Sequence, residues 1–234
     1  MFKKYNDKLF CFSPPVMLAT LVIEFCLAAY TFIKYKMTTI SRLAIAILIT
    51  LGIFQLSEYM ICGGFGLTHA EWTKFGYIAT ALLPAFGIHL VVSIAQKKSP
   101  LIVGLAYASS ILFIAYYSLN SASISGQECY ANYAVFYATG LMSQLFAVYY
   151  FGWLSISCYI AIHWSRRLPE KRIALHSVVI GGLLFIVPTY FFNVIDPTTT
   201  KGIPSIMCGF AVIFALILAL RVLPNSCQNR KTIK

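Results

Sequence analysis

The chain has 234 residues, of which 59% are hydrophobic and only 11% are charged. A soluble globular domain carries about 45–50% apolar and about 25% charged residues, so this chain has too little charge to cover a water-facing surface. The aromatic content of 15% excludes a disordered chain, and seven cysteines in this length exclude a disulfide-built mini-protein.

Seven apolar runs are long enough to cross a bilayer, whose core of about 30 Å needs about 20 helical residues. Together they use nearly the whole chain, which predicts an all-α fold: a single domain over residues 1–234, built as a seven-transmembrane-helix bundle. The fifth run is longer than a span, so we expect its outer part to be tilted or to lie at the membrane interface. The runs are approximately Ser13–Ile33, Leu43–Cys62, Phe75–Ala95, Leu101–Leu119, Val135–Trp164, Ile173–Ile195 and Pro204–Leu223.

The basic residues predict the orientation of the bundle. From the first connecting segment to the tail, the numbers of Lys and Arg alternate as 3, 1, 2, 0, 4, 1 and 4. The positive-inside rule then places the N-terminus outside and the C-terminus in the cytoplasm, although Lys3, Lys4 and Lys8 disagree. The net charge of +11 therefore indicates orientation and not nucleic-acid binding. The loop with Arg166, Arg167, Lys171 and Arg172 would also suit anionic lipid headgroups.

Glu24 and His89 are ionisable residues deep inside expected spans, where charge is costly and indicates function by default. Counted at 1.5 Å per residue, the two lie about 16 Å and about 20 Å below the outer ends of their spans, so they could meet. Such a pair could relay protons or help to bind a metal. The alternative is a buried polar contact that fixes helix packing.

Glu58 lies one turn from the outer end of the second span, and Gln55, Glu58 and Cys62 share one helix face by their spacing. The outer ends of other spans bring further polar residues to a similar depth, which predicts an outward polar pocket. The alternative is an ordinary hydrated layer at the helix ends. The other pocket candidates are Cys11, Asn193, Asp196 and Cys208.

The outer cysteines allow a disulfide between Cys62 and Cys129, although connectivity cannot be deduced from sequence. No pair has CxxC spacing, so the sequence predicts no zinc site, and it names no cofactor.

Three short motifs carry a family resemblance. They are Cys11-Phe12-Ser13 before the first span, Phe54-Gln55-Leu56-Ser57-Glu58 at the end of the second, and Ser205-Ile206-Met207-Cys208-Gly209-Phe210-Ala211 at the start of the seventh. They resemble an uncharacterised family of small bacterial seven-helix membrane proteins, with departures at residues 1–10, which are extra, and at Tyr59, which replaces a small residue. The family has no assigned activity. The resemblance implies a bacterial inner membrane and one outer site containing Cys11, Gln55, Glu58 and Cys208.

A weaker similarity links Leu83-Pro84 and Gly87-Ile88-His89-Leu90 to the third helix of the seven-helix sensor region of some histidine kinases. Those proteins continue into a cytoplasmic kinase, whereas this sequence stops soon after its last span. If the chain is a sensor, we expect its output to pass through a partner protein.

The leading functional expectation is a ligand-binding or sensing protein, or an accessory subunit of a membrane complex, with other membrane proteins as partners. One alternative is an intramembrane enzyme, which could depend on a metal and would use Glu58 or Glu24 as acid or base. The other is a proton-coupled transporter that uses Glu24 and His89.

Overall fold

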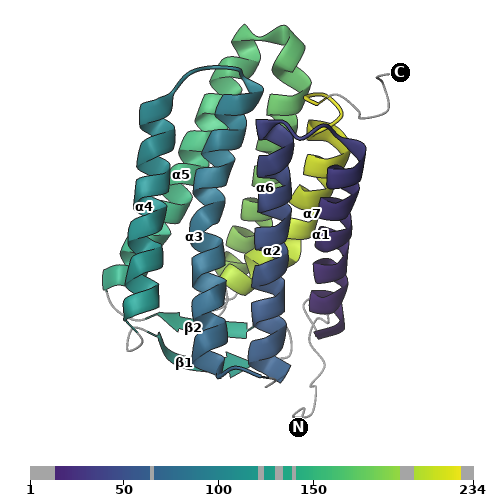
Figure 1. Ribbon diagram of the computed structural model, residues 1–234. Helices are drawn as coiled ribbons and strands as arrows, with labels where there is room; N and C mark the ends of the chain where they lie inside the picture. Colours follow the sequence, from purple (N-terminus) through teal and green to yellow (C-terminus); the bar gives the residue numbers. More distant parts are fainter. Residues whose placement is uncertain are drawn as a thin grey trace.

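The computed structural model describes residues 14–63, 66–120, 124–129, 134–138, 141–195 and 203–227, and these form an elongated helical bundle (Figure 1). Its elements, in chain order, are α1 (Pro14–Lys34), α2 (Thr39–Gly63), α3 (His69–Ile94), α4 (Pro100–Leu119), β1 (Ile124–Cys129), β2 (Ala134–Ala138), α5 (Leu141–Arg167), the 3-10 turn η3 (Pro169–Lys171), α6 (Arg172–Ile195), α7 (Ile203–Ile217) and the π-helical turn η5 (Leu218–Val222).

Within the described ranges, six helices are long and apolar enough to cross a membrane. Five are α1 to α5, and the sixth is the stretch Pro169–Pro188, which covers η3 and most of α6. The expected seventh span corresponds to α7 and η5, whose apolar stretch Gly209–Val222 is shorter. The sequence therefore predicted a membrane-embedded helical bundle correctly.

The helices run alternately up and down, so the bundle has two chemically different ends (Figure 1). We call the end with the two strands, where α2 and α4 finish, the hairpin end. We call the opposite end, where α1, α3 and α5 finish, the basic end. Helix α2 lies between α1 and α3 and packs on both, while α7 packs on α1, α2 and α6.

The structure adds a short β-hairpin to the predicted helical bundle. β1 and β2 pair antiparallel, with Glu128 opposite Val135 and Cys129 opposite Ala134, and β1 contacts α2 and α3. The expected fifth span began at Val135, but the helix begins at Leu141. The run Ala134–Ala138 is apolar, so it lengthened the fifth expected span at its start. Its Val, Phe and Tyr residues nevertheless favour a strand.

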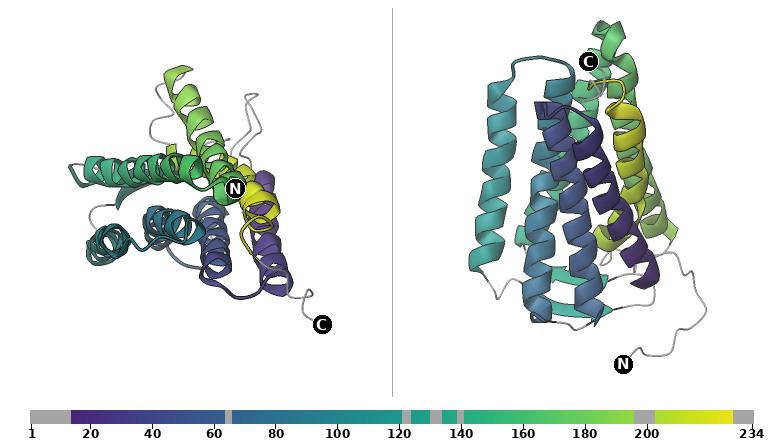
Figure 2. Two further views of the ribbon diagram at one scale, coloured as in Figure 1. Left: turned by 90° about the horizontal axis from the view of Figure 1, so that it is seen from above. Right: turned by 45° about the vertical axis from the view of Figure 1, so that its right-hand side comes forward.

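Helix α5 has 27 residues, which at 1.5 Å per residue makes it about 40 Å long. That length exceeds a hydrocarbon core of about 30 Å, and tilting is the usual accommodation. In the views of Figure 2, α5 crosses the bundle obliquely, whereas α2 and α4 are seen nearly end-on from above.

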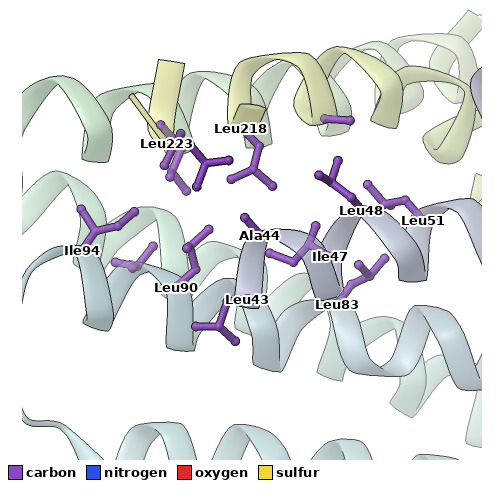
Figure 3. Close-up of a cluster of buried hydrophobic side chains, with 14 of the residues drawn as sticks. Leu43, Ala44, Ile47, Leu48, Leu51, Leu83, Leu90, Ile94, Leu218 and Leu223 are labelled. Carbon is purple, nitrogen blue, oxygen red and sulfur yellow. The ribbon is translucent and has the colours of Figure 1, made fainter. Parts of the chain in front are cut away.

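The main apolar core joins helices that are far apart in the sequence. Leu43, Ala44 and Ile47 of α2 lie with Leu90 of α3 and Leu218 of η5 in one buried cluster (Figure 3). This contact holds the last helical segment against the centre of the bundle.

A polar contact supports α3 beside Pro84. Proline has no amide hydrogen, so it cannot make the helical bond to the carbonyl four residues earlier. One turn away, the Tyr149 hydroxyl of α5 donates to the Ala81 carbonyl at 2.5 Å. Ser110 Oγ of α4 lies 2.9 Å from the same oxygen and 2.6 Å from the Tyr149 hydroxyl. The contact ties α3, α4 and α5 together.

Candidate functional site

Glu24 lies in the middle of α1, on the side that faces the bundle. The buried positions of α1 include Leu21, Glu24 and Ala28, spaced 3 and 4 residues apart, while Phe25 and Ile33 are exposed. This spacing keeps the buried positions on one helix face. The chain therefore directs a carboxyl group into its interior, where Glu24 is 0% exposed.

Gln55 and Glu58 lie on α2, which is buried on several sides because α1 and α3 flank it. Both side chains are 1% exposed. Among the described residues, Glu58 is the charged group that acts on Glu24. The structure thus brings together the two acidic side chains that the sequence places inside spans, one from each of two neighbouring antiparallel helices.

The carboxyl group of Glu24 is not satisfied by its surroundings. Among the described residues, neither of its oxygens has a hydrogen-bond partner, and neither does Nε2 of Gln55. A buried polar group without a partner costs about 1–3 kcal/mol, and more when it is charged. Such groups are normally bonded to protein or to ordered water, so the Glu24 oxygens and Gln55 Nε2 are left able to bond a further group.

Nearby hydroxyl groups donate elsewhere. Thr20 Oγ1 donates to the carbonyl of Met17 at 2.9 Å, and Ser57 Oγ donates to the carbonyl of Ile53 at 2.9 Å. Each hydroxyl has a single hydrogen, which these bonds to its own helix use.

An aromatic cluster adjoins the face of α2 that carries Glu58. Phe54, Glu58 and Ile61 share that face by their spacing, and Phe54 and Ile61 pack with Tyr77 and Tyr117. The rings of Tyr77 and Tyr117 stack with centroids 4.4 Å apart. The Tyr117 hydroxyl is buried and has no hydrogen-bond partner among the described residues. The site therefore combines two carboxyl groups and one amide with an apolar, aromatic flank.

His89 belongs to a different part of the bundle. Its Nδ1 lies 3.1 Å from the Tyr107 hydroxyl of α4, and the two rings meet edge to face with centroids 5.8 Å apart. The described contacts do not join His89 to Glu24, and α2 lies between their helices. Glu24 interacts instead with Glu58.

The remaining predicted site residues cannot be placed by their side chains. Cys11 and Asp196 lie outside the described residues. For four other residues the structure describes the backbone, near the hairpin end, but not the side chain. They are Cys62 of α2, Cys129 of β1, Asn193 of α6 and Cys208 of α7. Their convergence on Glu58, and the disulfide between Cys62 and Cys129, stay predictions.

Within the described part of the chain, no group of three or more His, Cys, Asp or Glu residues is arranged to hold a metal ion. The described side chains of the site are a pair of carboxyl groups and a neighbouring amide. Such a group can accept hydrogen bonds, neutralise a positive charge or hold a proton.

No protein-family model matches the chain, and no curated protein matches it. The resemblance to small bacterial seven-helix membrane proteins accordingly stays a prediction.

Sequence reasoning missed the pairing of Glu24 with Glu58. The sequence gives the depth of a residue below the end of its span, but this depth does not say toward which neighbouring helix the side chain points. The useful signal was the spacing of Leu21, Glu24 and Ala28, which puts the acid on the face of α1 that packs toward α2.

Proposed function

We propose that this chain is a seven-span integral membrane protein, N-terminus outside and C-terminus in the cytoplasm, that binds and senses a small ligand inside its bundle. The observation that carries the binding proposal is the buried group of Glu24, Gln55 and Glu58, with unsatisfied polar atoms on Glu24 and Gln55.

Two features support the span number and orientation. Helix α7 continues through η5 to Val222, and together they are long enough to cross the bilayer core. The basic residues of the connecting turns gather at the basic end, where Lys97, Arg167 and Lys171 lie, whereas Glu71, Lys74 and Glu128 lie at the hairpin end. The positive-inside rule makes the basic end cytoplasmic.

The chemistry of the site favours a ligand that carries positive charge. Carboxylate oxygens only accept hydrogen bonds, so the ligand must either donate hydrogen bonds to them or balance their charge as a cation. A charge-assisted bond of this kind is about twice as strong as a neutral one, and the apolar surroundings strengthen it further. A small ammonium compound or a monovalent cation meets this requirement, whereas an anion would be repelled.

The test is thermal unfolding of the full chain in lipid nanodiscs with four additives: sodium, ethylammonium, acetate and glycerol. A compound that binds only the folded state raises Tm. We expect sodium or ethylammonium to raise Tm of the unmodified protein and acetate and glycerol to leave it unchanged.

The double variant Glu24→Gln/Glu58→Gln should lose the response, because it removes both carboxyl groups that would balance the charge of the cation. The control is Glu170→Gln, which removes an exposed carboxyl group in η3 and should respond like the unmodified chain. Equal responses in the double variant and the control would overturn the proposed site.

A further inference from the structure

We propose that the turn between α5 and α6 binds the headgroup of an anionic phospholipid at the membrane surface. This turn, residues 166–172, comprises the end of α5, all of η3 and the first residue of α6. It lies at the basic end of the bundle, whereas Glu24 lies in the middle of α1 and Glu58 near the hairpin end. Lipid binding at this turn is therefore independent of the ligand proposed for the buried carboxyl groups.

The α5–α6 turn concentrates positive charge. Four basic residues and one acidic residue, Glu170, give it a net charge of +3. The three arginines are exposed and the lysine is half-buried: Arg166, Arg167, Arg172 and Lys171. None of these four side chains forms an ion pair with another residue that the structure describes. Their charge is therefore available to an anion from outside the chain.

The position of the turn brings this charge to the membrane surface. In both side views, the connection between α5 and α6 stands above the ends of α1 and α3 (Figures 1 and 2). Arg166 and Arg167 form the last turn of α5, and charged side chains are excluded from the hydrocarbon core. We therefore expect the basic side chains of the turn to lie among the lipid headgroups.

Apolar side chains continue from the turn toward the membrane interior. Tyr159, Ile162 and Arg166 are spaced 3 and 4 residues apart, so they share one face of α5. Tyr159 is 70% exposed, and Ile173, beside Arg172 at the start of α6, is 57% exposed. A phospholipid has the matching arrangement, an anionic headgroup joined to apolar chains. A water-soluble anion could use only the basic part of this surface, which favours a lipid as the occupant.

The start of α6 adds a second attraction for an anion. A helix N-terminus carries partial positive charge, which a nearby anion stabilises and a cation does not. Helix α6 nevertheless begins at Arg172 and has no acidic residue in its first turn. Glu170 in η3 supplies one negative charge against four positive ones. An anionic headgroup at this turn would offset the remaining charge.

The connection between α3 and α4 provides a matched comparison. Lys97 and Lys98 are also exposed and also lie at the basic end. If the basic residues served orientation alone, the two connections would have the same preference for an anionic lipid. A headgroup site at the α5–α6 turn instead makes its arginines the more important residues.

The experiment is native mass spectrometry of the full chain in detergent, titrated with phosphatidylglycerol or phosphatidylcholine. The titration gives a Kd for the first bound molecule of each lipid. Because a basic residue near an anionic headgroup contributes about fivefold in affinity, phosphatidylglycerol should bind about tenfold or more tightly than phosphatidylcholine. For the same reason, Arg166→Gln/Arg167→Gln should raise the Kd for phosphatidylglycerol about tenfold or more. Lys97→Gln/Lys98→Gln should leave it nearly unchanged. Equal Kd values for the two lipids, or equal losses in the two double variants, would overturn the site.

Two further measurements separate charge from folding and lipid from free anion. Arg166→Lys/Arg167→Lys keeps the charge, so it should bind phosphatidylglycerol more tightly than the Gln variant does. A Lys variant as weak as the Gln variant would show that charge is not the cause. Glycerol phosphate, added as a soluble headgroup at the concentration of the lipid, should not displace phosphatidylglycerol. Displacement would mean that the turn binds a free anion, which contradicts a lipid site.

Discussion

Glu24 differs from most buried polar residues of the bundle in having no partner in its own helix. Thr31 and Thr50, for example, donate to backbone carbonyls four residues earlier, at 2.8 Å and 2.6 Å. A hydroxyl can be satisfied in this way inside a lipid-embedded helix, whereas a carboxylate cannot, because all carbonyls are acceptors. Glu24 must therefore be satisfied from outside its own helix, by a proton, a ligand or a neighbouring side chain.

A stability prediction follows for Glu24→Gln. Gln has nearly the same shape and no charge, so the substitution removes one of two interacting acids from the interior. We expect stabilisation of about 1 kcal/mol or more, because burying an ionisable group beside another acid costs stability. Thermal unfolding in nanodiscs measures the change, with Glu170→Gln as the control. A clear decrease in Tm would show that Glu24 has a favourable structural contact.

The contact beside Pro84 gives a second prediction. Tyr149→Phe removes the hydroxyl that donates to the Ala81 carbonyl and should destabilise the protein by about 1 kcal/mol, the usual net value of a hydrogen bond. Ser110→Ala removes the second hydroxyl at the same oxygen. Because the two hydroxyls also bond to each other, we expect the double variant to differ from the sum of the single variants by 0.5 kcal/mol or more. Strict additivity would contradict a shared network.

At the scale of elements, apolar length predicted most helices to within a few residues, because a span must match the bilayer core. The expected run Leu101–Leu119 became α4, Pro100–Leu119, and Ile173–Ile195 became α6, Arg172–Ile195. Hydropathy did not separate Val135 and its neighbours from the helix that follows, since a strand and a helix can be equally apolar. The hairpin was missed for that reason.

Two helical glycines should respond differently to substitution by alanine. A Cβ added at Gly181 of α6 would lie 2.6 Å from Cδ2 of Phe214 in α7, whereas a Cβ at Gly104 of α4 would meet nothing within 4 Å. We expect Gly181→Ala to destabilise the bundle by about 1–3 kcal/mol through overpacking. The matched variant Gly104→Ala should be neutral or slightly stabilising, because Ala favours helix. Equal Tm values for the two variants would contradict the close packing of α6 on α7.

At the scale of the whole molecule, the sequence predicted the class of architecture better than the site. Composition and the seven runs were sufficient for a membrane helical bundle, since an apolar segment of this length satisfies its backbone hydrogen bonds within itself when it crosses lipid as a helix. Which side chains meet depends on the rotation and packing of each helix. The pairing of Glu24 with Glu58 therefore needed three-dimensional information, although the sequence places both acids inside expected spans.

The proposed orientation predicts which surface positions water-soluble reagents can reach. Cysteines introduced as Lys97→Cys and Glu170→Cys lie exposed at the basic end, and Leu67→Cys lies exposed at the hairpin end. In intact cells, a membrane-impermeant thiol reagent should label Leu67→Cys above the background of the native cysteines. The other two should be labelled only after permeabilisation. The reverse pattern would invert the orientation.

The short connection between α1 and α2, residues 35–38, has a consequence for how the protein enters the membrane. Alone, α1 would present the carboxyl group of Glu24 to lipid, and an acid at the centre of an inserting helix costs about 2.5–3.5 kcal/mol. Because the connection holds α2 antiparallel against the same face, the two helices can cover that group as soon as both have left the ribosome. We therefore infer that they insert together, as a helical hairpin, and that α1 made without α2 would partition poorly into the bilayer during synthesis.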